Sequence, residues 1–120
     1  MSAQPEVVDG TESLGVRLQG ELTMETAPAL TQALGALARE RDASSMVIDL
    51  REVSFLDSTC LSALLEARRV QIRQGGTLAL LVAADGAISD LFRISGTHEL
   101  LGVREDVVGP LESFVDGQLP

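Results

Sequence analysis

One stretch of the chain decides the fold, and it reads Val47-Ile-Asp-Leu-Arg-Glu-Val-Ser-Phe-Leu-Asp-Ser-Thr-Cys-Leu-Ser-Ala-Leu-Leu65. It begins inside an apolar run, Ser45–Leu50, which is too short for a stable helix and predicts a buried central strand. A loop over Val53–Asp57 follows. Beyond the loop, apolar residues recur every three or four positions, which predicts an amphipathic helix. The chain therefore passes from strand to helix immediately after Asp57.

The segments after this stretch continue the pattern. The predicted helix ends before Gly75 and Gly76, and the apolar run Thr77–Val82 beyond them predicts another buried strand. Strand, helix and strand then form one right-handed crossover unit. The apolar stripe of the helix is expected to consist of Leu61, Leu64, Leu65, Arg68 and Ile72.

Two further strands are predicted before Val47–Leu65. Leu14, Val16 and Leu18 alternate with other residue types, which predicts a half-buried strand ending at Gly20. The short segment Glu6–Val8 is expected to pair with this strand.

A helix is predicted between these strands and the central one. Thr26 is its candidate N-cap, Pro28 lies in its first turn, and it should end near Arg41. Its apolar residues recur at helical spacing and are Leu30, Ala33, Leu34 and Leu37.

The last third of the chain predicts three short elements. A helix, ended by a left-handed Gly96, is followed by a strand over Leu100–Val103 and by a final helix that starts near Gly109 and Pro110. A polar tail, 116–120, closes the chain. The stripe of the first helix is Ile88, Leu91, Phe92 and Ser95, and that of the last is Leu111, Phe114 and Val115.

The alternation of strands and helices predicts an α/β fold with a central mixed, mostly parallel sheet of four to five strands and about four helices. A chain of 120 residues fits one domain, and 45% hydrophobic residues are enough to form a core. We therefore expect a single domain over 1–120, with its core at about 6–116.

The charge of the chain excludes several chemistries. The formal net charge is -9, and all nine basic residues are arginine. Without lysine the chain has neither a phosphate-binding P-loop nor a Schiff-base amine. Nucleic acid is not an expected partner, because polyanion binding needs a basic surface. The acidic surface serves either solubility or steering toward a basic partner.

The sequence also predicts a cytoplasmic location. Its longest uncharged apolar stretch, Thr77–Ala84, is far shorter than the roughly 20 residues that span a bilayer, so no membrane segment is expected. The first residues, Met1–Glu6, lack the basic and apolar regions of a secretory signal. A lone Cys60 forms no intrachain disulfide, which agrees with a reducing compartment.

Asp57, Ser58 and Thr59 are the candidate site, because they stand where the predicted helix begins. One interpretation is plain capping, since these side chains accept hydrogen bonds from the free N–H groups of a helix start. The other is phosphorylation of Ser58, which adds about -1.5 to -2 charges beside the Asp57 carboxylate and changes the surface for a docked partner. The residues alone leave both open.

The chain resembles the STAS domain family, which the anti-sigma factor antagonists share with the cytoplasmic tails of sulfate transporters. The family's order and spacing are matched by Gly20-Glu-Leu22, Asp49-Leu50, Val53-Ser-Phe-Leu-Asp-Ser-Thr59, Gly75-Gly76 and Leu91-Phe-Arg-Ile-Ser-Gly96. The resemblance implies an antagonist that binds an anti-sigma factor with serine kinase activity and releases sigma. It also implies that phosphorylation of Ser58 ends this binding and that a separate serine phosphatase reverses it.

We expect the partner to bind at the start of the Ser58 helix. This helix and the loops beside it would form the docking face, with Leu61 and Leu64 anchoring the helix underneath. This chain carries Thr23 where the family commonly has aspartate and Cys60 where it usually has glycine. A phosphorylation-independent STAS module, acting as a scaffold or small-ligand sensor, is therefore the alternative. The expected partner-binding residues are Glu21, Thr23, Asp57, Ser58, Thr59, Cys60 and Ser62.

No catalytic residue, metal or cofactor is expected, and the chain is not predicted to be an enzyme. Ser58 lacks the Gly-x-Ser-x-Gly turn and a base, and His98 is assigned to a surface loop. Cys60 is expected to be a small buried residue. A receiver domain phosphorylated on Asp49 or Asp57 would need a lysine that the chain lacks. The particular sigma factor and the oligomeric state stay open.

Overall fold

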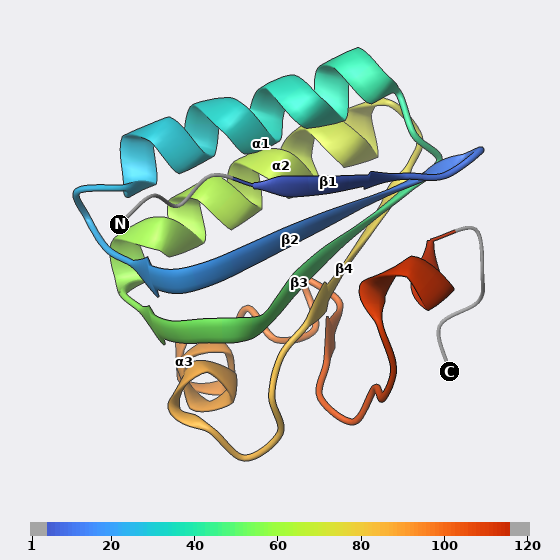
Figure 1. Ribbon diagram of the computed structural model, residues 1–120. Coiled ribbons are helices and arrows are strands. Elements are labelled where there is room, and N and C mark those ends of the chain that lie inside the picture. Colours follow the sequence, from blue (N-terminus) through green and yellow to red (C-terminus); the bar gives the residue numbers. More distant parts are fainter. Residues whose placement is uncertain (1–4, 116–120) are drawn as a thin grey trace.

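The computed structural model describes residues 5–115, which form one five-stranded sheet of order β1-β2-β3-β4-β5. The first pair of strands is antiparallel and every later pair is parallel (Figure 1). The prediction of a mixed, mostly parallel α/β sheet is confirmed. The strands are β1 (Glu6–Asp9), β2 (Ser13–Leu22), β3 (Ser45–Leu56), β4 (Thr77–Leu81) and β5 (Val103–Arg104).

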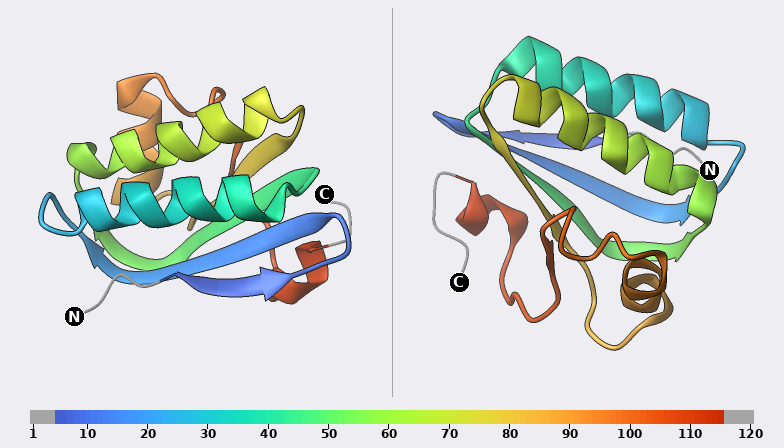
Figure 2. Two further views of the ribbon diagram at one scale, coloured as in Figure 1. Left: turned by 90° about the horizontal axis from the view of Figure 1, so that it is seen from above. Right: turned by 180° about the vertical axis from the view of Figure 1, so that it is seen from behind.

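Two long helices, α1 (Ala27–Arg41) and α2 (Leu61–Arg73), lie side by side across one face of the sheet (Figure 2). The shorter α3 (Ala87–Ser95) contributes Phe92 to the same core. Two 3₁₀ turns complete the described helical structure. They are η1 (Ser58–Cys60), directly before α2, and η2 (Leu111–Phe114), which covers the other face of the sheet. No helix within residues 5–115 has the length and hydropathy needed to cross a membrane.

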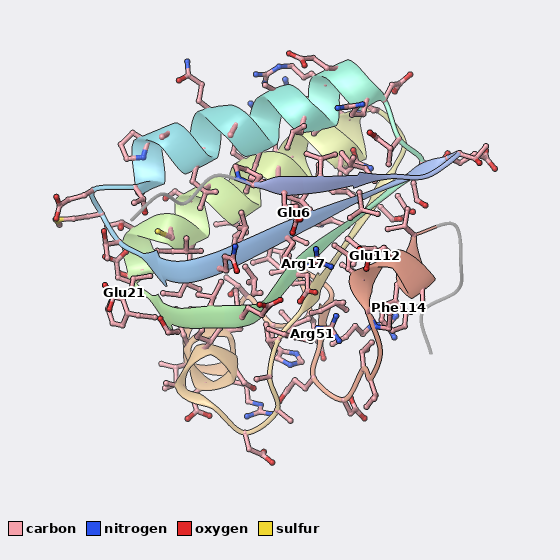
Figure 3. All side chains as sticks on the ribbon, viewed as in Figure 1. Glu6, Arg17, Glu21, Arg51, Glu112 and Phe114 are labelled. Carbon is pink, nitrogen blue, oxygen red and sulfur yellow. The ribbon has the colours of Figure 1, made fainter. Side chains whose placement is uncertain are left out.

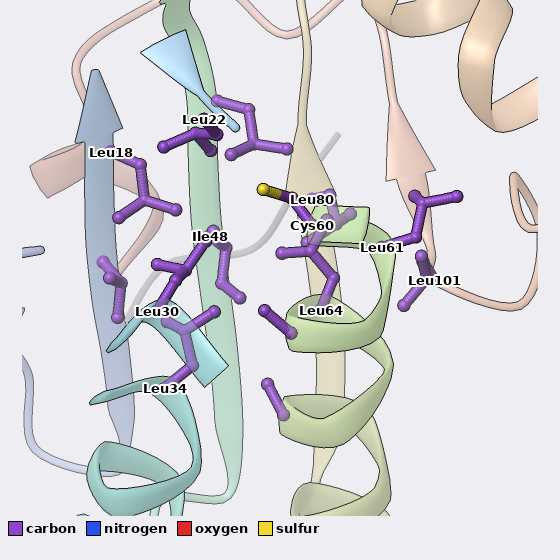
Figure 4. Packing of buried hydrophobic residues seen from close by; sticks show 14 of the residues in the cluster. Leu18, Leu22, Leu30, Leu34, Ile48, Cys60, Leu61, Leu64, Leu80 and Leu101 are labelled. Atoms are coloured by element: carbon purple, nitrogen blue, oxygen red, sulfur yellow. The ribbon is translucent and has the colours of Figure 1, made fainter. Parts of the chain in front are cut away.

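The main core lies between the sheet and the two long helices. Leu18, Ile48 and Leu80 project from three neighbouring strands toward Leu34 and Leu64 on α1 and α2 (Figure 4). All five side chains are fully buried. The alternating and helical patterns of the sequence therefore face each other as predicted.

The strands β2 and β3 are both longer than predicted. β2 continues past Gly20 to Leu22, and the segment expected to be the loop Val53–Asp57 is strand up to Leu56. The register between the two strands shifts on either side of Gln19 and Gly20. Such bulges break the period of two that a strand prediction depends on, and Gly20 takes the required left-handed backbone with φ 83°.

The buried face of α2 differs from the predicted stripe. Ile72 is half exposed, with Arg68 and Leu65 at the edge of the contact. Alanines at 63 and 67 are buried instead, because α2 packs on α1 as well as on the sheet and small side chains allow close contact. The buried residues of α2 are Leu61, Ala63, Leu64, Ala67, Val70 and Gln71.

The three short elements predicted after β4 are present at the expected positions, but two of them differ in length or helix type. Gly96 ends α3 in the left-handed conformation, with φ 77°. The last strand is only Val103–Arg104, since turns occupy the residues from Thr97 to Gly102. The final helix is the 3₁₀ turn η2, too short for an α-helix. The tail 116–120, with the last residue of the predicted core, lies outside the described residues.

Candidate functional site

The site lies at the carboxyl ends of β2 and β3, where the β2–α1 loop meets the β3–α2 turn. Glu21 marks this end of the sheet in Figure 3, well away from Arg17 and Arg51. Asp57 N donates to Leu22 O at 3.1 Å, so the two connections start from a common point. Loops at the carboxyl ends of parallel strands are the usual place for binding sites in such sheets.

The Asp57 carboxylate organises this corner. One oxygen, Oδ1, accepts the Thr59 N–H at 3.1 Å and the Thr59 hydroxyl, which caps η1. The other, Oδ2, accepts the N–H of Met24 at 2.8 Å across the two loops. The Thr59 hydroxyl, helped by these N–H groups, holds the pKa of Asp57 below its usual value. The carboxylate is therefore ionised at neutral pH, and the capping interpretation is confirmed for Asp57.

Ser58 and Thr59 are both exposed but differ in their hydroxyl groups. Thr59 donates to Asp57, as above. The Ser58 hydroxyl makes no hydrogen bond with any described residue. Of the two adjacent hydroxyls, only that of Ser58 is both accessible and unbonded.

Cys60 and Thr23, which differ from the common family pattern, contact one another. The Cys60 thiol is fully buried and donates from Sγ to the Thr23 carbonyl at 3.4 Å. Burial, followed by the charge of Asp57, raises the pKa of this thiol. Cys60 therefore supports the β2–α1 loop from below as a neutral thiol, and Thr23, half buried, lies between it and the surface.

The β2–α1 loop is closed by Thr26. Its Oγ1 accepts the Thr23 N–H at 3.0 Å and donates to the Thr23 carbonyl at 2.9 Å. Thr26 is the residue before α1 as predicted, but its side chain makes no hydrogen bond to the helix. It fixes the turn instead, through its two hydrogen bonds to the Thr23 backbone.

The remaining predicted residues lie at the rim. Glu21, at the end of β2, and Ser62, on the first turn of α2, are exposed. The structure adds two apolar side chains that the sequence prediction missed. Met24 is 65% and Phe55 49% exposed. The sequence alone could not place Phe55 at this site, because its position depends on the register between β2 and β3. In that register Phe55 is the partner of Glu21, on the part of β3 that extends beyond the predicted strand.

A hollow of about 500 Å³ on the opposite face of the sheet is a second candidate. Its charged groups are already paired. Arg51 makes two hydrogen bonds to Asp49, at 2.8 and 2.9 Å, and donates to the Gly109 carbonyl at 2.7 Å. Burial raises the pKa of Asp49, but the bonds from Arg51 outweigh it and hold the pKa below normal. These contacts attach the η2 segment to the sheet, as does Arg17 between Glu6 and Glu112 (Figure 3).

Other reactive residues are accounted for by local contacts. His98 Nε2 lies 2.7 Å from Glu105 Oε2 in the turn after α3. Within the described part of the chain, no group of three or more His, Cys, Asp or Glu is placed to hold a metal ion.

The fold and the site together define an α/β protein with an exposed serine at the turn that leads into its central crossover helix. The family model described as "Mlab, STAS domain" matches residues 7–102. The chain belongs to the STAS domain family. The resemblance seen in the sequence is thereby confirmed.

Characterised relatives agree with this assignment. The chain is 28% identical over 103 residues to the anti-sigma-B factor antagonist of Bacillus subtilis (strain 168), covering 86% of this chain and 92% of that protein. An anti-sigma factor antagonist from Mycobacterium paratuberculosis superposes with a TM-score of 0.72 at 27% identity, over 83% of each chain. Unphosphorylated SpoIIAA shares the fold, with a TM-score of 0.73 at 18% identity, over 92% of this chain and 93% of its own.

Proposed function

We propose that the chain is an anti-sigma factor antagonist switched by phosphorylation of Ser58. Unmodified, it binds an anti-sigma factor with serine kinase activity, so that sigma is released. The observation that carries this proposal is the free, exposed Ser58 hydroxyl beside the bonded Thr59. The names of the Bacillus and Mycobacterium relatives support the same role.

The chemistry of the switch is a phosphoryl transfer from ATP. The Ser58 oxygen forms a bond to the γ-phosphorus, ADP leaves, and the hydroxyl proton passes to a base of the kinase. The product places about two negative charges next to the ionised Asp57 carboxylate. The start of η1 and α2 favours a negative charge, so the fold is retained while the docking surface changes. Binding should therefore be lost without unfolding.

The proposed partners follow from this cycle. The kinase is the anti-sigma factor itself, and a separate serine phosphatase restores the unmodified form. The net charge of -9 argues against nucleic acid and favours a basic docking surface on the partner. The protein acts as one binding domain in the cytoplasm and supplies no catalytic residue.

The test combines the purified chain with candidate anti-sigma kinases of its own genome, ATP and magnesium, and measures intact mass and complex formation. We expect one phosphoryl adduct on Ser58 and loss of the complex. Ser58→Ala should bind and stay unmodified, and Thr59→Ala, the matched control, should still be modified. Ser58→Asp should weaken binding by about 1 to 3 kcal/mol. An adduct on Thr59, or equal affinity of Ser58→Asp and wild type, contradicts the switch.

A phosphorylation-independent binding module is the second candidate. It is favoured by the contact between Cys60 and Thr23, the two departures from the common family pattern, directly beneath the proposed phosphosite. A stable complex without any adduct would support it. Reverting Cys60 to glycine and Thr23 to aspartate should then restore modification if these residues caused its loss.

A further inference from the structure

Two apolar side chains are exposed where β2 and β3 end, the end of the sheet from which the chain turns to the proposed phosphosite. Phe55 and Glu21 are register partners at the ends of β3 and β2, while their neighbours Leu56 and Leu22 are buried in the core. Since successive strand residues point to opposite faces, Phe55 and Glu21 share the outer face. Met24 projects from the β2–α1 loop with 65% of its surface exposed. Methionine and phenylalanine are enriched in the centres of protein interfaces.

The position of Met24 depends on the turn that carries Ser58. Its N–H donates to Asp57 Oδ2 at 2.8 Å, a contact between residues 33 apart in the chain. The loop around it is held by Thr26 and, from below, by the Cys60 thiol. Of these contacts, only the one from Asp57 comes from the residue next to Ser58. A change at Ser58 can therefore reach Met24 through one carboxylate.

We propose that Met24 is an apolar anchor for the partner, that Asp57 is the residue that positions it, and that phosphorylation of Ser58 releases it. This inference rests on the proposed function. It predicts that the partner, the anti-sigma kinase, has an apolar pocket with a basic rim that receives Met24. The basic rim is expected because Met24 is accompanied by carboxylates at Glu21, Glu25 and Asp57.

The release has a physical cause. A phosphate on Ser58 repels the Asp57 carboxylate, which accepts the N–H groups of Met24 and Thr59. This repulsion moves the carboxylate away from the β2–α1 loop. The Met24 N–H then loses its acceptor at 2.8 Å, and the loop is no longer held in the docking conformation.

The first test needs no partner. Phosphoserine is encoded at position 58 of the full chain, and the Met24 amide is followed by ¹⁵N NMR and hydrogen exchange. We expect a shifted Met24 resonance and exchange faster by about tenfold, the factor for an ordinary hydrogen bond. Asp57→Asn should accelerate the same amide. Phosphoserine at position 113, on η2 at the opposite face, is the matched control and should leave it unchanged. An unaltered Met24 amide in the phosphoserine-58 protein overturns the inference.

The second test measures affinity for the kinase identified above. Met24→Ala should weaken the complex by about tenfold or more. Val108→Ala, at another exposed apolar residue, 90% exposed after β5, should not. The inference is overturned if Met24→Ala binds the kinase with wild-type affinity. It is also overturned if the wild-type chain forms a dimer that Met24→Ala converts to a monomer, because Met24 would then contact a second copy of the chain. If phosphoserine at 58 abolishes binding while the Met24 amide stays unchanged, the inference fails and the proposed function stands. If no kinase modifies Ser58, the proposed function fails. The first test then still decides whether a phosphate on Ser58 breaks the bond between Met24 and Asp57.

Discussion

Leu64 shows how a single residue of α2 supports both the fold and the site. Its side chain is fully buried between α1 and the sheet, close to Cys60 (Figure 4). We predict that Leu64→Ala lowers the free energy of unfolding by about 2 to 5 kcal/mol, because it removes buried methyl groups and leaves a cavity. Urea denaturation followed by circular dichroism measures the change.

Ile72 is the matched control for this substitution. It lies two turns further along the same helix but is 50% exposed. Ile72→Ala should cost less than about 1 kcal/mol, since most of the removed surface already contacts water. Equal losses for the two variants would mean that the buried face of α2 is not the one described.

At the scale of elements, the η2 segment is held against the sheet at a position that requires glycine. A Cβ on Gly15 in β2 would lie 2.7 Å from Val115 Cγ2 and 3.2 Å from Leu111. We predict that Gly15→Ala lowers the free energy of unfolding by about 1 kcal/mol or more through overpacking. Thermal or urea unfolding measures the loss.

The same substitution in α1 should have the opposite sign. Gly35 lies inside the helix, and the nearest atoms to an added Cβ belong to the flexible Arg39 side chain, at 3.3 Å. Gly35→Ala should therefore raise the free energy of unfolding by about 0.5 to 1 kcal/mol, because alanine is the better helix former. A gain at both positions would show that η2 does not press on β2.

At the scale of the whole molecule, stability should fall in acid. Four carboxylates, Asp49, Asp57, Glu66 and Glu105, have a lowered pKa in the folded protein. The pKa of Glu105 falls from 4.5 to about 2, chiefly through the Ser89 hydroxyl and then His98, with Arg93 beside them. The folded state thus binds fewer protons than the unfolded state between these values. The stabilisation is complete above about pH 4.5 and is lost as the pH falls toward 2.

Urea midpoints measured from pH 7 to 2.5 test this prediction. Glu105→Gln should be less stable than wild type at pH 7, and its stability should decline less steeply below pH 4.5. Glu99→Gln, at an exposed residue that makes none of these contacts, is the control. Parallel declines of wild type and Glu105→Gln would exclude Glu105 as a source of the acid sensitivity.

The sequence alone determined most of the fold. The strand β2 and the helices α1 and α2 follow from apolar patterns with periods of two and 3.6, and β4 follows from a short continuous apolar run. These patterns depend only on neighbouring residues. The place of Ser58 at the strand-to-helix turn follows in the same way. The family resemblance rested on short motifs at these same boundaries, and the match over residues 7–102 confirmed it.

Only the tertiary structure decided the details of the site. The bulged register of β2 against β3 brings Phe55 beside Glu21, and the register shift erased the pattern that would have predicted this strand. The bond from Met24 to Asp57 and the contact of Cys60 with Thr23 join residues more than 30 positions apart. The bond from the Thr59 hydroxyl to Asp57, which leaves the neighbouring Ser58 hydroxyl unbonded among the described residues, is also seen only in the structure. Local sequence patterns cannot encode such contacts, because they exist only once the sheet has brought the two loops together.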